Sequence, residues 1–277
     1  KRPPPPFLGH VFLPAVEGRR RTPGMRKVFL EGFPERRAVM TVDGRAVYWE
    51  RTRAPGEAGP ALSPTLSPSL FGAELRRRFF SVPADVDLVV AMYAELVADA
   101  FGHAPTLSYR GARWGDPEMA ELAKLLREVP HPNVSHLDLS RNPHVTNLIA
   151  LGSAISNGAL VMLTKLDLSY CRELVALPAG IATLSALVEL ILEGCNAFEA
   201  CPTLSGLTKL RVLNLANCLR VTALPPGVQH LRSLSSLDAW GCRALRALPD
   251  LARLRSLRTV NISYCRALGE LPPLYGL

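Results

Sequence analysis

The chain contains six cysteines, whose thiols could form disulfides, bind a metal ion or act as nucleophiles. Their spacing indicates packing instead, because five of them recur at intervals of 23 or 24 residues, at Cys171, Cys195, Cys218, Cys242 and Cys265. A small buried thiol packs as a hydrophobe, and its weak S–H donor can meet a backbone carbonyl in a turn. We therefore predict six free, buried thiols. Free thiols in this number favour a reducing, intracellular compartment such as the cytoplasm.

The six histidines do not predict a catalytic or metal-binding cluster. His131, His136 and His144 lie within 14 residues of one another, but no Cys pair or acidic residue with metal-ligand spacing accompanies them. Surface positions are the ordinary interpretation of such histidines. The phosphate-binding pattern G-x-x-x-x-G-K-[ST] does not occur in the sequence either. The sequence therefore predicts no enzyme activity, no cofactor and no metal site.

The segments that carry the cysteines repeat one nine-residue phrase, L-x-x-L-x-L-x-x-N/C, whose places we number one to nine. Place four holds Leu137, Leu166, Leu190, Leu213, Leu237 and Val260, at spacings of 29, 24, 23, 24 and 23 residues. This period and pattern are those of a leucine-rich repeat. Asn142 takes place nine in the first clear copy, ahead of the five cysteines, which predicts a structural Asn/Cys ladder. Cys201 instead occupies a core place that is Leu177 in the preceding repeat.

We therefore predict an α/β leucine-rich-repeat solenoid over residues 106–277, with clear copies from residue 134 and a parallel β-sheet on its concave side. The first repeats leave room for convex helices, one starting with Asp116 as N-cap and Pro117 as first helical residue, and one over Leu148–Ile155.

Later repeats change character on the convex side. Each carries Leu-Pro or its equivalent six residues beyond the Cys, as in Leu177-Pro178 and Leu224-Pro225. Proline resists helix, so an extended or 3-10 convex side is expected there. The sequence stops at Leu277 within a repeat, and we expect further chain or a neighbouring molecule to bury that end.

The part before the repeats divides into four segments. Residues 1–27 are basic and rich in Pro and Arg, which predicts disorder or, alternatively, part of an organelle-import peptide. Residues 28–53 contain two β-prone runs joined by Asp-Gly, which predicts a β-hairpin. Residues 54–80 are rich in Pro, Gly and Ser and are expected to form a linker. Residues 81–105 have apolar residues at helical spacing, which predicts a capping helix.

The net charge of +8 belongs to the start of the chain. Residues 1–80 hold 15 Lys/Arg against 7 Asp/Glu, whereas residues 81–277 hold 17 of each. We expect no general nucleic-acid affinity in the neutral repeats, and an anionic partner only for residues 1–80. No run of 18 apolar residues occurs, so no membrane-spanning helix is expected.

The later repeats resemble those of a known family. The stretch from Leu166 to Leu187, LDLSYCRELVALPAGIATLSAL, is similar to the leucine-rich repeats of plant-type intracellular disease-resistance receptors and related short-repeat scaffold proteins. The earlier stretch Gly115–Leu126 resembles the ribonuclease-inhibitor style of repeat. The resemblance covers roughly residues 106–277 and implies a recognition surface. Those receptors carry a nucleotide-binding domain before the repeats, and residues 1–105 show no such motif.

The solvent-facing places of the sheet define a candidate binding surface. The leucines of the phrase face the core, so places two, three, five, seven and eight face the concave side. Two neighbouring repeats bring four residues together there: Asp238, Trp240, Asn261 and Tyr264. Aromatic residues within a polar rim are typical of a binding hot spot. The alternative is an ordinary solvated sheet with single exposed aromatics, and this alternative applies more strongly to Tyr170.

An arginine row follows the ladder. Arg172, Arg243 and Arg266 each come directly after a place-nine Cys. Guanidinium groups along the edge of a sheet can bind an acidic peptide or phosphate groups.

These features predict a non-catalytic recognition module that binds a protein partner on its concave face, in the manner of intracellular immune-type sensing. Two alternatives stay open from the sequence. The chain could be a scaffold subunit of a large assembly, or the regulatory repeat region of a longer enzyme such as a ubiquitin ligase or kinase.

Overall fold

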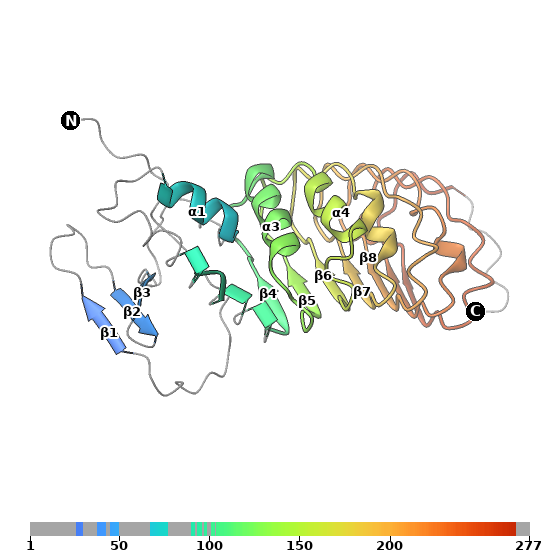
Figure 1. The fold of residues 1–277 in the computed structure, drawn as a ribbon. Helices are drawn as coiled ribbons and strands as arrows, with labels where there is room; N and C mark the ends of the chain where they lie inside the picture. Colours follow the sequence, from blue (N-terminus) through green and yellow to red (C-terminus); the bar gives the residue numbers. More distant parts are fainter. Residues whose placement is uncertain are drawn as a thin grey trace, which may run out of the picture.

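The computed structural model describes residues 26–29, 38–42, 45–49, 67–76, 90–91, 93–95, 97–98, 101–102 and 104–269. An open sheet of seven parallel strands, in sequence order, runs through the last of these ranges (Figure 1). Its strands are β4 (Thr106–Ser108), β5 (His136–Asp138), β6 (Lys165–Asp167), β7 (Glu189–Ile191), β8 (Val212–Asn214), β9 (Ser236–Asp238) and β10 (Thr259–Asn261). The predicted leucine-rich-repeat solenoid is confirmed.

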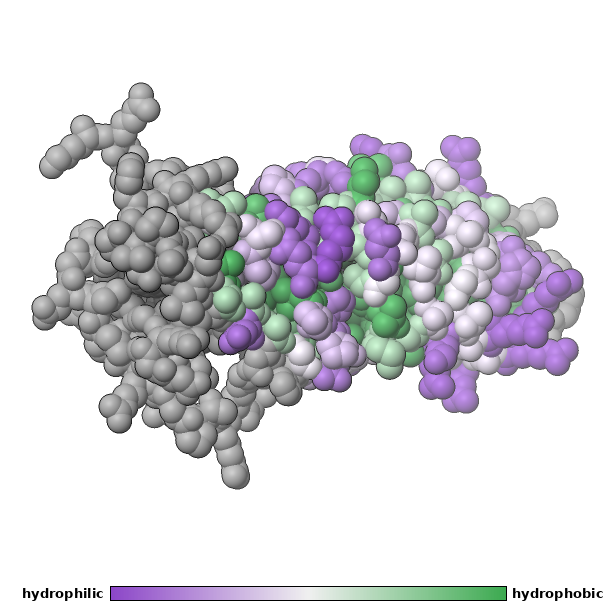
Figure 2. All heavy atoms as spheres, viewed as in Figure 1, coloured by the Kyte–Doolittle hydropathy of each residue, from purple (hydrophilic) through white to green (hydrophobic). Residues whose placement is uncertain are grey.

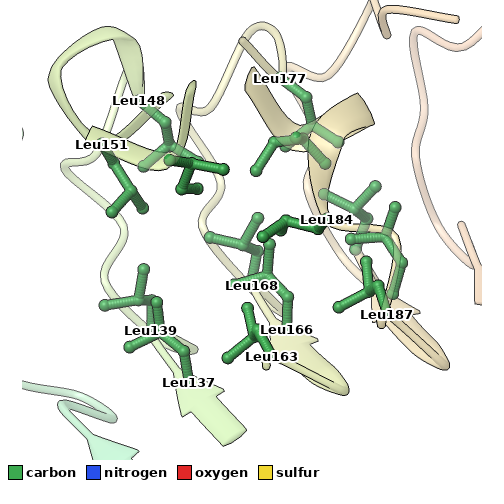
Figure 3. Close-up of a cluster of buried hydrophobic side chains, with 14 of the residues drawn as sticks. Leu137, Leu139, Leu148, Leu151, Leu163, Leu166, Leu168, Leu177, Leu184 and Leu187 are labelled. Carbon is green, nitrogen blue, oxygen red and sulfur yellow. The ribbon is translucent and has the colours of Figure 1, made fainter. Parts of the chain in front are cut away.

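The core lies between the sheet and the convex side. Place-four residues pair across neighbouring strands, for example Leu137 with Leu166 and Leu213 with Leu237, and these four side chains are at most 1% exposed. Figure 3 shows leucines of three successive repeats pointing into this shared interior. One repeat cannot bury both faces of its leucines, so each depends on its neighbours. Val260, on the last strand of the sheet, is 37% exposed.

The predicted Asn/Cys ladder has a defined hydrogen-bond pattern. Each place-nine thiol donates to the carbonyl of place six in the preceding repeat, as Cys195 does to Leu168 at 3.2 Å and Cys242 to Leu215 at 3.1 Å. The Asn142 amide follows the same rule, because its Nδ2 donates to the Tyr109 carbonyl at 3.0 Å.

All six cysteines are free thiols. Four of the thiols are buried as expected, whereas Cys201 and Cys265 are only half-buried. Burial raises the pKa of the Cys171, Cys201 and Cys242 thiols to about 12, and it also raises the pKa of Cys265. These groups are therefore thiols rather than thiolates at neutral pH, which makes them poor nucleophiles.

The convex side changes from helix to 3-10 helix along the solenoid, as expected. It carries α3 (Asp116–Glu128) and α4 (Ile149–Ser156), followed by the 3-10 helices η2 (Ala179–Thr183) and η3 (Val228–His230). Figure 1 shows α3 and α4 along one side of the repeats and the strands along the other.

The start of α3 differs from the predicted one. Gly115, not Asp116, is the N-cap, and its N–H donates to Oε2 of Glu118 at 2.8 Å. Asp116 is the first helical residue, and its carboxylate accepts hydrogen bonds from the backbone of Thr146 and Asn147 in the next repeat. Partial burial opposes ionisation, but these hydrogen bonds outweigh it and lower the pKa of Asp116. Asp116 therefore ties two repeats together.

The step from α-helix to 3-10 helix depends on close backbone contact. A Cβ at Gly180, in η2, would lie 2.1 Å from the Gly152 carbonyl oxygen of α4, and a Cβ at Gly152 would lie 2.4 Å from Pro178. Only glycine allows this approach.

The first repeat is covered by helical residues. Within 90–102, Tyr93, Val97 and Phe101 are helical, spaced by four and buried, while the capping helix over residues 81–105 as a whole stays a prediction. Residues 68–76 differ from the linker expected there, because they form α1 (Pro68–Arg76). Ser67 precedes Pro68, and serine before proline is a helix-start signal as well as a linker feature.

Helix α1 packs on the cap. The Phe71 ring stacks on Tyr93 with centroids 4.0 Å apart, and Ser69 donates from its N–H and its hydroxyl to the Glu128 carboxylate, at 3.0 and 2.5 Å.

The described residues before α1 form a separate three-stranded antiparallel sheet. Its strands are β1 (Arg26–Phe29), β2 (Ala38–Val42) and β3 (Arg45–Trp49), so the expected hairpin of β2 and β3 gains a third strand. The other expectations for residues 1–66, and those for residues 270–277, lie outside the described residues. Among the helices that the structure describes, none has the length and apolarity needed to cross a bilayer.

The ladder predicts how the thiols react. In native protein at about pH 8, a disulfide reagent such as Ellman's should react slowly, with the half-buried Cys265 first, because the thiolate is the attacking species. Unfolding in guanidinium without reductant should release six thiols per chain. Cys265→Ala should remove the fastest native phase. Fewer than six thiols after unfolding, or several fast native thiols, would contradict the ladder.

The glycine contact predicts a stability effect. Gly180→Ala should lower the free energy of unfolding by about 1–3 kcal/mol, because the new methyl group meets backbone that cannot move aside cheaply. Urea unfolding followed by circular dichroism measures the loss. Gly102→Ala is the matched control: it is helical and its Cβ would meet no atom within 4 Å. An equal loss in both variants would refute the close-contact explanation.

Candidate binding surface on the concave sheet

Every strand ends in the same turn, and place eight of the phrase always has a left-handed backbone. The seven residues there have φ between +59° and +72°: Gly111, Arg141, Tyr170, Gly194, Asn217, Gly241 and Tyr264. Glycine and asparagine accept this conformation readily, whereas other residues meet a steric cost of about 1–2 kcal/mol. Tyrosine at this place is therefore held by its surroundings.

The turn is held by neighbouring repeats. In six of the seven turns the place-eight N–H donates to the place-seven carbonyl of the next repeat, as from Tyr170 to Glu193 at 2.6 Å and from Asn217 to Trp240 at 2.6 Å. These bonds fix the backbone whatever the side chain. The Tyr264 N–H makes no such bond within the described part of the chain.

Place five has a structural task that the sequence analysis did not assign to it. The Asp238 carboxylate accepts the N–H of Trp240 at 2.9 Å, and the Asn261 amide oxygen accepts the N–H of Ser263 at 3.2 Å. Asp138 and Asp167 accept in the same way in earlier repeats. Asp238 thus orients the strand end that carries Trp240, and one of its two oxygens is already committed.

Trp240 and Tyr264 meet as predicted. Their rings pack edge to face, with centroids 5.6 Å apart and an interplanar angle of 75°. Trp240 is 38% exposed and Tyr264 is 67% exposed. Edge-to-face packing is a favoured aromatic geometry, worth about 0.5–1.5 kcal/mol beyond area burial. The pair is a preformed aromatic patch at the carboxyl ends of β9 and β10.

Tyr170 is in a different situation. Its hydroxyl donates to Oε1 of Glu193 at 2.5 Å, and Arg141 lies over its ring with 5.6 Å between the guanidinium carbon and the ring centroid. The hydrogen bond to Glu193 raises the pKa of the Tyr170 hydroxyl. The ring also covers Gly194, where a Cβ would lie 2.7 Å from it. Tyr170 is already engaged within the solenoid.

The arginine row is discontinuous. Arg243 and Arg266 are exposed and lie in adjacent repeats, where the Ala267 N–H donates to the Arg243 carbonyl at 3.2 Å. Arg172 is exposed as well, but it lies three repeats away from Arg243. Arg243 and Arg266 follow Trp240 and Tyr264 by three and two residues, so two of the three arginines come directly after the strand ends that carry the aromatic patch.

The three clustered histidines have separate environments. His131 links two elements, because its Nδ1 lies 2.8 Å from the Val129 carbonyl and its Nε2 accepts the Leu160 N–H at 3.0 Å. His144 lies 3.7 Å from the Glu173 carboxylate. Among the described residues, no three His, Cys, Asp or Glu side chains are arranged to hold a metal ion.

A second polar region, at the opposite ends of the strands, was not predicted from the sequence. A groove of about 600 Å³ lies where the chain enters β8, β9 and β10, and it is lined by Arg211, Ser233, Ser235, Arg255, Ser256 and Arg258. The net charge of residues 81–277 is zero and gives no sign of this groove. The net charge of the last repeats alone would have indicated it, because residues 200–277 hold 10 Lys/Arg against 3 Asp/Glu.

Comparison with known proteins adds only distant structural similarity. No family model and no curated protein matches the sequence. The chain is similar to a leucine-rich repeat protein of Leptospira interrogans, at 20% identity and a TM-score of 0.31, over 55% of this chain and 50% of that one. It therefore spans about half the length of that protein.

Two further structures are similar. The leucine-rich repeat domain of the type III effector XopL matches at 18% identity and a TM-score of 0.39, over 75% of this chain and 85% of that one. An internalin from Listeria monocytogenes matches at 11% identity and a TM-score of 0.15, over 65% and 85%. Similarity at this level carries no conclusion about binding.

The left-handed backbone at Tyr264 predicts a distinctive mutational pattern. Tyr264→Asn should change the free energy of unfolding by less than about 1 kcal/mol, because relief of backbone strain offsets the lost ring contact. Tyr264→Val should destabilise by about 1–2 kcal/mol more than Asn, since β-branched residues avoid positive φ. Urea unfolding of the two variants side by side gives the comparison. Equal stabilities would show that the turn relaxes in solution.

Proposed function

We propose that the chain is a non-catalytic protein-recognition module whose concave sheet binds a protein partner at the aromatic patch formed by Trp240 and Tyr264. One observation carries the proposal. Tyr264 occupies a backbone conformation unfavourable to tyrosine, yet two thirds of its surface is exposed. An unfavourable backbone conformation at an exposed residue supports a role in binding rather than in stabilising the fold.

The chemistry of the patch fits a binding hot spot. Trp, Tyr and Arg dominate such sites, and rigid aromatic rings lose little entropy when they are buried by a partner. Trp240 and Tyr264 already fix each other, while Arg243 and Arg266 lie just beyond them. Asp238 positions Trp240 by accepting its backbone N–H. In the next repeat Asn261 accepts the Ser263 N–H in the same way. Tyr170 and Arg172 lie outside this patch.

The cellular setting is also part of the proposal. Six free thiols suit a reducing intracellular compartment. The likeness of the later repeats to those of plant-type disease-resistance receptors suggests immune-type sensing as the wider role. This assignment of pathway rests on the sequence resemblance alone.

The test is capture of binding partners by the wild-type chain and by the double variant Trp240→Ala/Tyr264→Asn. Partners identified by mass spectrometry with the wild type should be lost or reduced at least about tenfold with the variant, since a hot-spot residue contributes about 2 kcal/mol or more. Asparagine suits the left-handed backbone, so the fold is preserved.

Ile149→Ala serves as the matched control, because Ile149 is 71% exposed but lies on α4, away from the sheet. Its capture profile should equal that of the wild type. If the double variant retains every partner at wild-type level while remaining folded, the aromatic patch is not the binding site.

A further inference from the structure

The solenoid has a strong charge polarity along its length. Residues 81–199 hold 7 Lys/Arg against 14 Asp/Glu, whereas residues 200–277 hold 10 against 3. The neutral total of the repeats therefore hides one acidic half and one basic half. Figure 2 shows hydrophilic side chains gathered at the C-terminal end of the solenoid, beyond the paler middle repeats.

Part of this basic charge converges on the groove at the entry to β8, β9 and β10. Arg211, Ser235 and Arg258 occupy place two in three successive repeats and are adjacent rungs of the sheet. The Ser235 N–H donates to the Arg211 carbonyl at 2.8 Å, and the Arg258 N–H donates to the Ser235 carbonyl at 2.9 Å. Arg255 reaches the same groove from the preceding turn. Three guanidinium groups from three repeats thus line one hollow.

These three arginines are exposed and form no ion pair within the described part of the chain. Two other cations of the repeats are paired, Lys165 with Glu189 at 2.8 Å and Arg220 with Glu199 at 2.7 Å. Unpaired guanidinium groups on three neighbouring repeats repel one another, and an anion bound between them removes that cost.

The other residues that line the groove limit which class of anion it can bind. The Ser233 hydroxyl donates to the Thr208 carbonyl at 2.8 Å, and the Ser235 hydroxyl donates to the Arg211 carbonyl at 3.0 Å. Both hydroxyl hydrogens are therefore directed at backbone, and the arginines supply most of the free donors. The described residues that line the groove include no aromatic ring, so they offer no stacking platform of the kind that single-stranded nucleic acids use.

The spacing of the arginines fits an extended peptide. Strands lie about 4.8 Å apart, so Arg211 and Arg258 are separated by about 10 Å across the sheet. An extended chain advances about 3.3 Å per residue, so carboxylates three residues apart match this separation.

We propose that the groove lined by Arg211, Arg255 and Arg258 binds an acidic segment of a polypeptide partner, one carrying carboxylates about three residues apart. Each guanidinium can take a carboxylate through a two-pronged hydrogen bond, a geometry that lysine does not offer. The inference specifies the chemistry of the partner on the sheet, and to that extent it rests on the proposed function. It adds a second contact point at the opposite ends of the strands from the aromatic patch.

The test uses a dye-labelled dodecapeptide with Glu at every third position and Gly or Ser elsewhere, together with its Gln counterpart. Fluorescence anisotropy with the full chain should show binding of the Glu peptide that weakens as salt rises, and at least tenfold weaker binding of the Gln peptide. Arg211→Gln/Arg255→Gln/Arg258→Gln should raise the Kd for the Glu peptide at least tenfold.

The matched control is Arg232→Gln/Arg246→Gln/Arg253→Gln. It removes the same charge from the same basic part of the solenoid, residues 200–277, but from exposed residues outside the groove. Its Kd should stay within about threefold of wild type. If both triple variants lose the same affinity for the Glu peptide, the effect depends on net charge alone and the proposed site is wrong.

Two other occupants are outcomes that also overturn the proposal. One is tighter binding of a single-stranded DNA dodecamer that is lost on the groove substitutions. The other is wild-type self-association in sedimentation velocity that disappears in the groove variant.

The aromatic variant Trp240→Ala/Tyr264→Asn separates this inference from the proposed function. It should bind the Glu peptide normally, because that peptide has no aromatic contact to lose. If the groove variant binds the peptide like wild type while the aromatic variant still loses its captured partners, the groove fails and the recognition role stands. If the groove variant loses the peptide while the aromatic variant keeps its captured partners, the groove stands and the aromatic patch is not the binding site.

Discussion

Each repeat completes the turn that ends its strand only with groups from the repeats on either side. The place-eight N–H reaches forward to a carbonyl of the next repeat, as from Arg141 to Ser169 at 2.7 Å. The place-nine side chain reaches back to a carbonyl of the preceding repeat, as from Cys218 to Leu192 at 3.2 Å. The same Leu192 carbonyl also accepts the Cys195 N–H of its own repeat at 3.2 Å, so the thiol adds a second hydrogen bond that joins the two repeats. Stability is therefore a property of neighbouring pairs of repeats rather than of single repeats.

This arrangement explains how the sheet can present unusual side chains. Where the next repeat fixes the backbone at place eight, as at Tyr170, a residue poorly suited to positive φ can still be held there. Tyr170 recovers part of that cost through Arg141 and Glu193 inside the solenoid. Tyr264 has only the edge of Trp240, and most of its ring is exposed. The two tyrosines share a place in the phrase but differ in what they leave available to a partner.

The fold was predictable because its main signals are local and repeated. The 23–24-residue period locates the strands, and the recurrence of Cys171 and its counterparts at one place predicts their burial without any structure. Hydrogen bonds between repeats were not predictable, since they depend on which atoms the turns bring together. Asp116, Asp238 and Asn261 were interpreted as a cap or as binding residues, yet each accepts a backbone N–H. The helix after Ser67 was missed because Ser-Pro is typical of both linkers and helix starts.

The arginine groove could not be predicted from the net charge of residues 81–277, because that total averages over repeats whose charges differ. Contacts in a solenoid run only between neighbours, so the charge at place two can change from one repeat to the next without disturbing the core. Place two is Ser135, Thr164 and Val188 in the first three clear repeats, and it is Arg211, Ser235 and Arg258 in the last three. The aromatic patch lies at the other ends of β9 and β10, at most about 20 Å away, because six residues rise about 3.3 Å each when fully extended. A partner whose acidic segment crosses the strands at the groove, and whose apolar anchor reaches the other ends of β9 and β10, would engage both sites together. The effective concentration of the second contact would then make the pair bind more tightly than either alone.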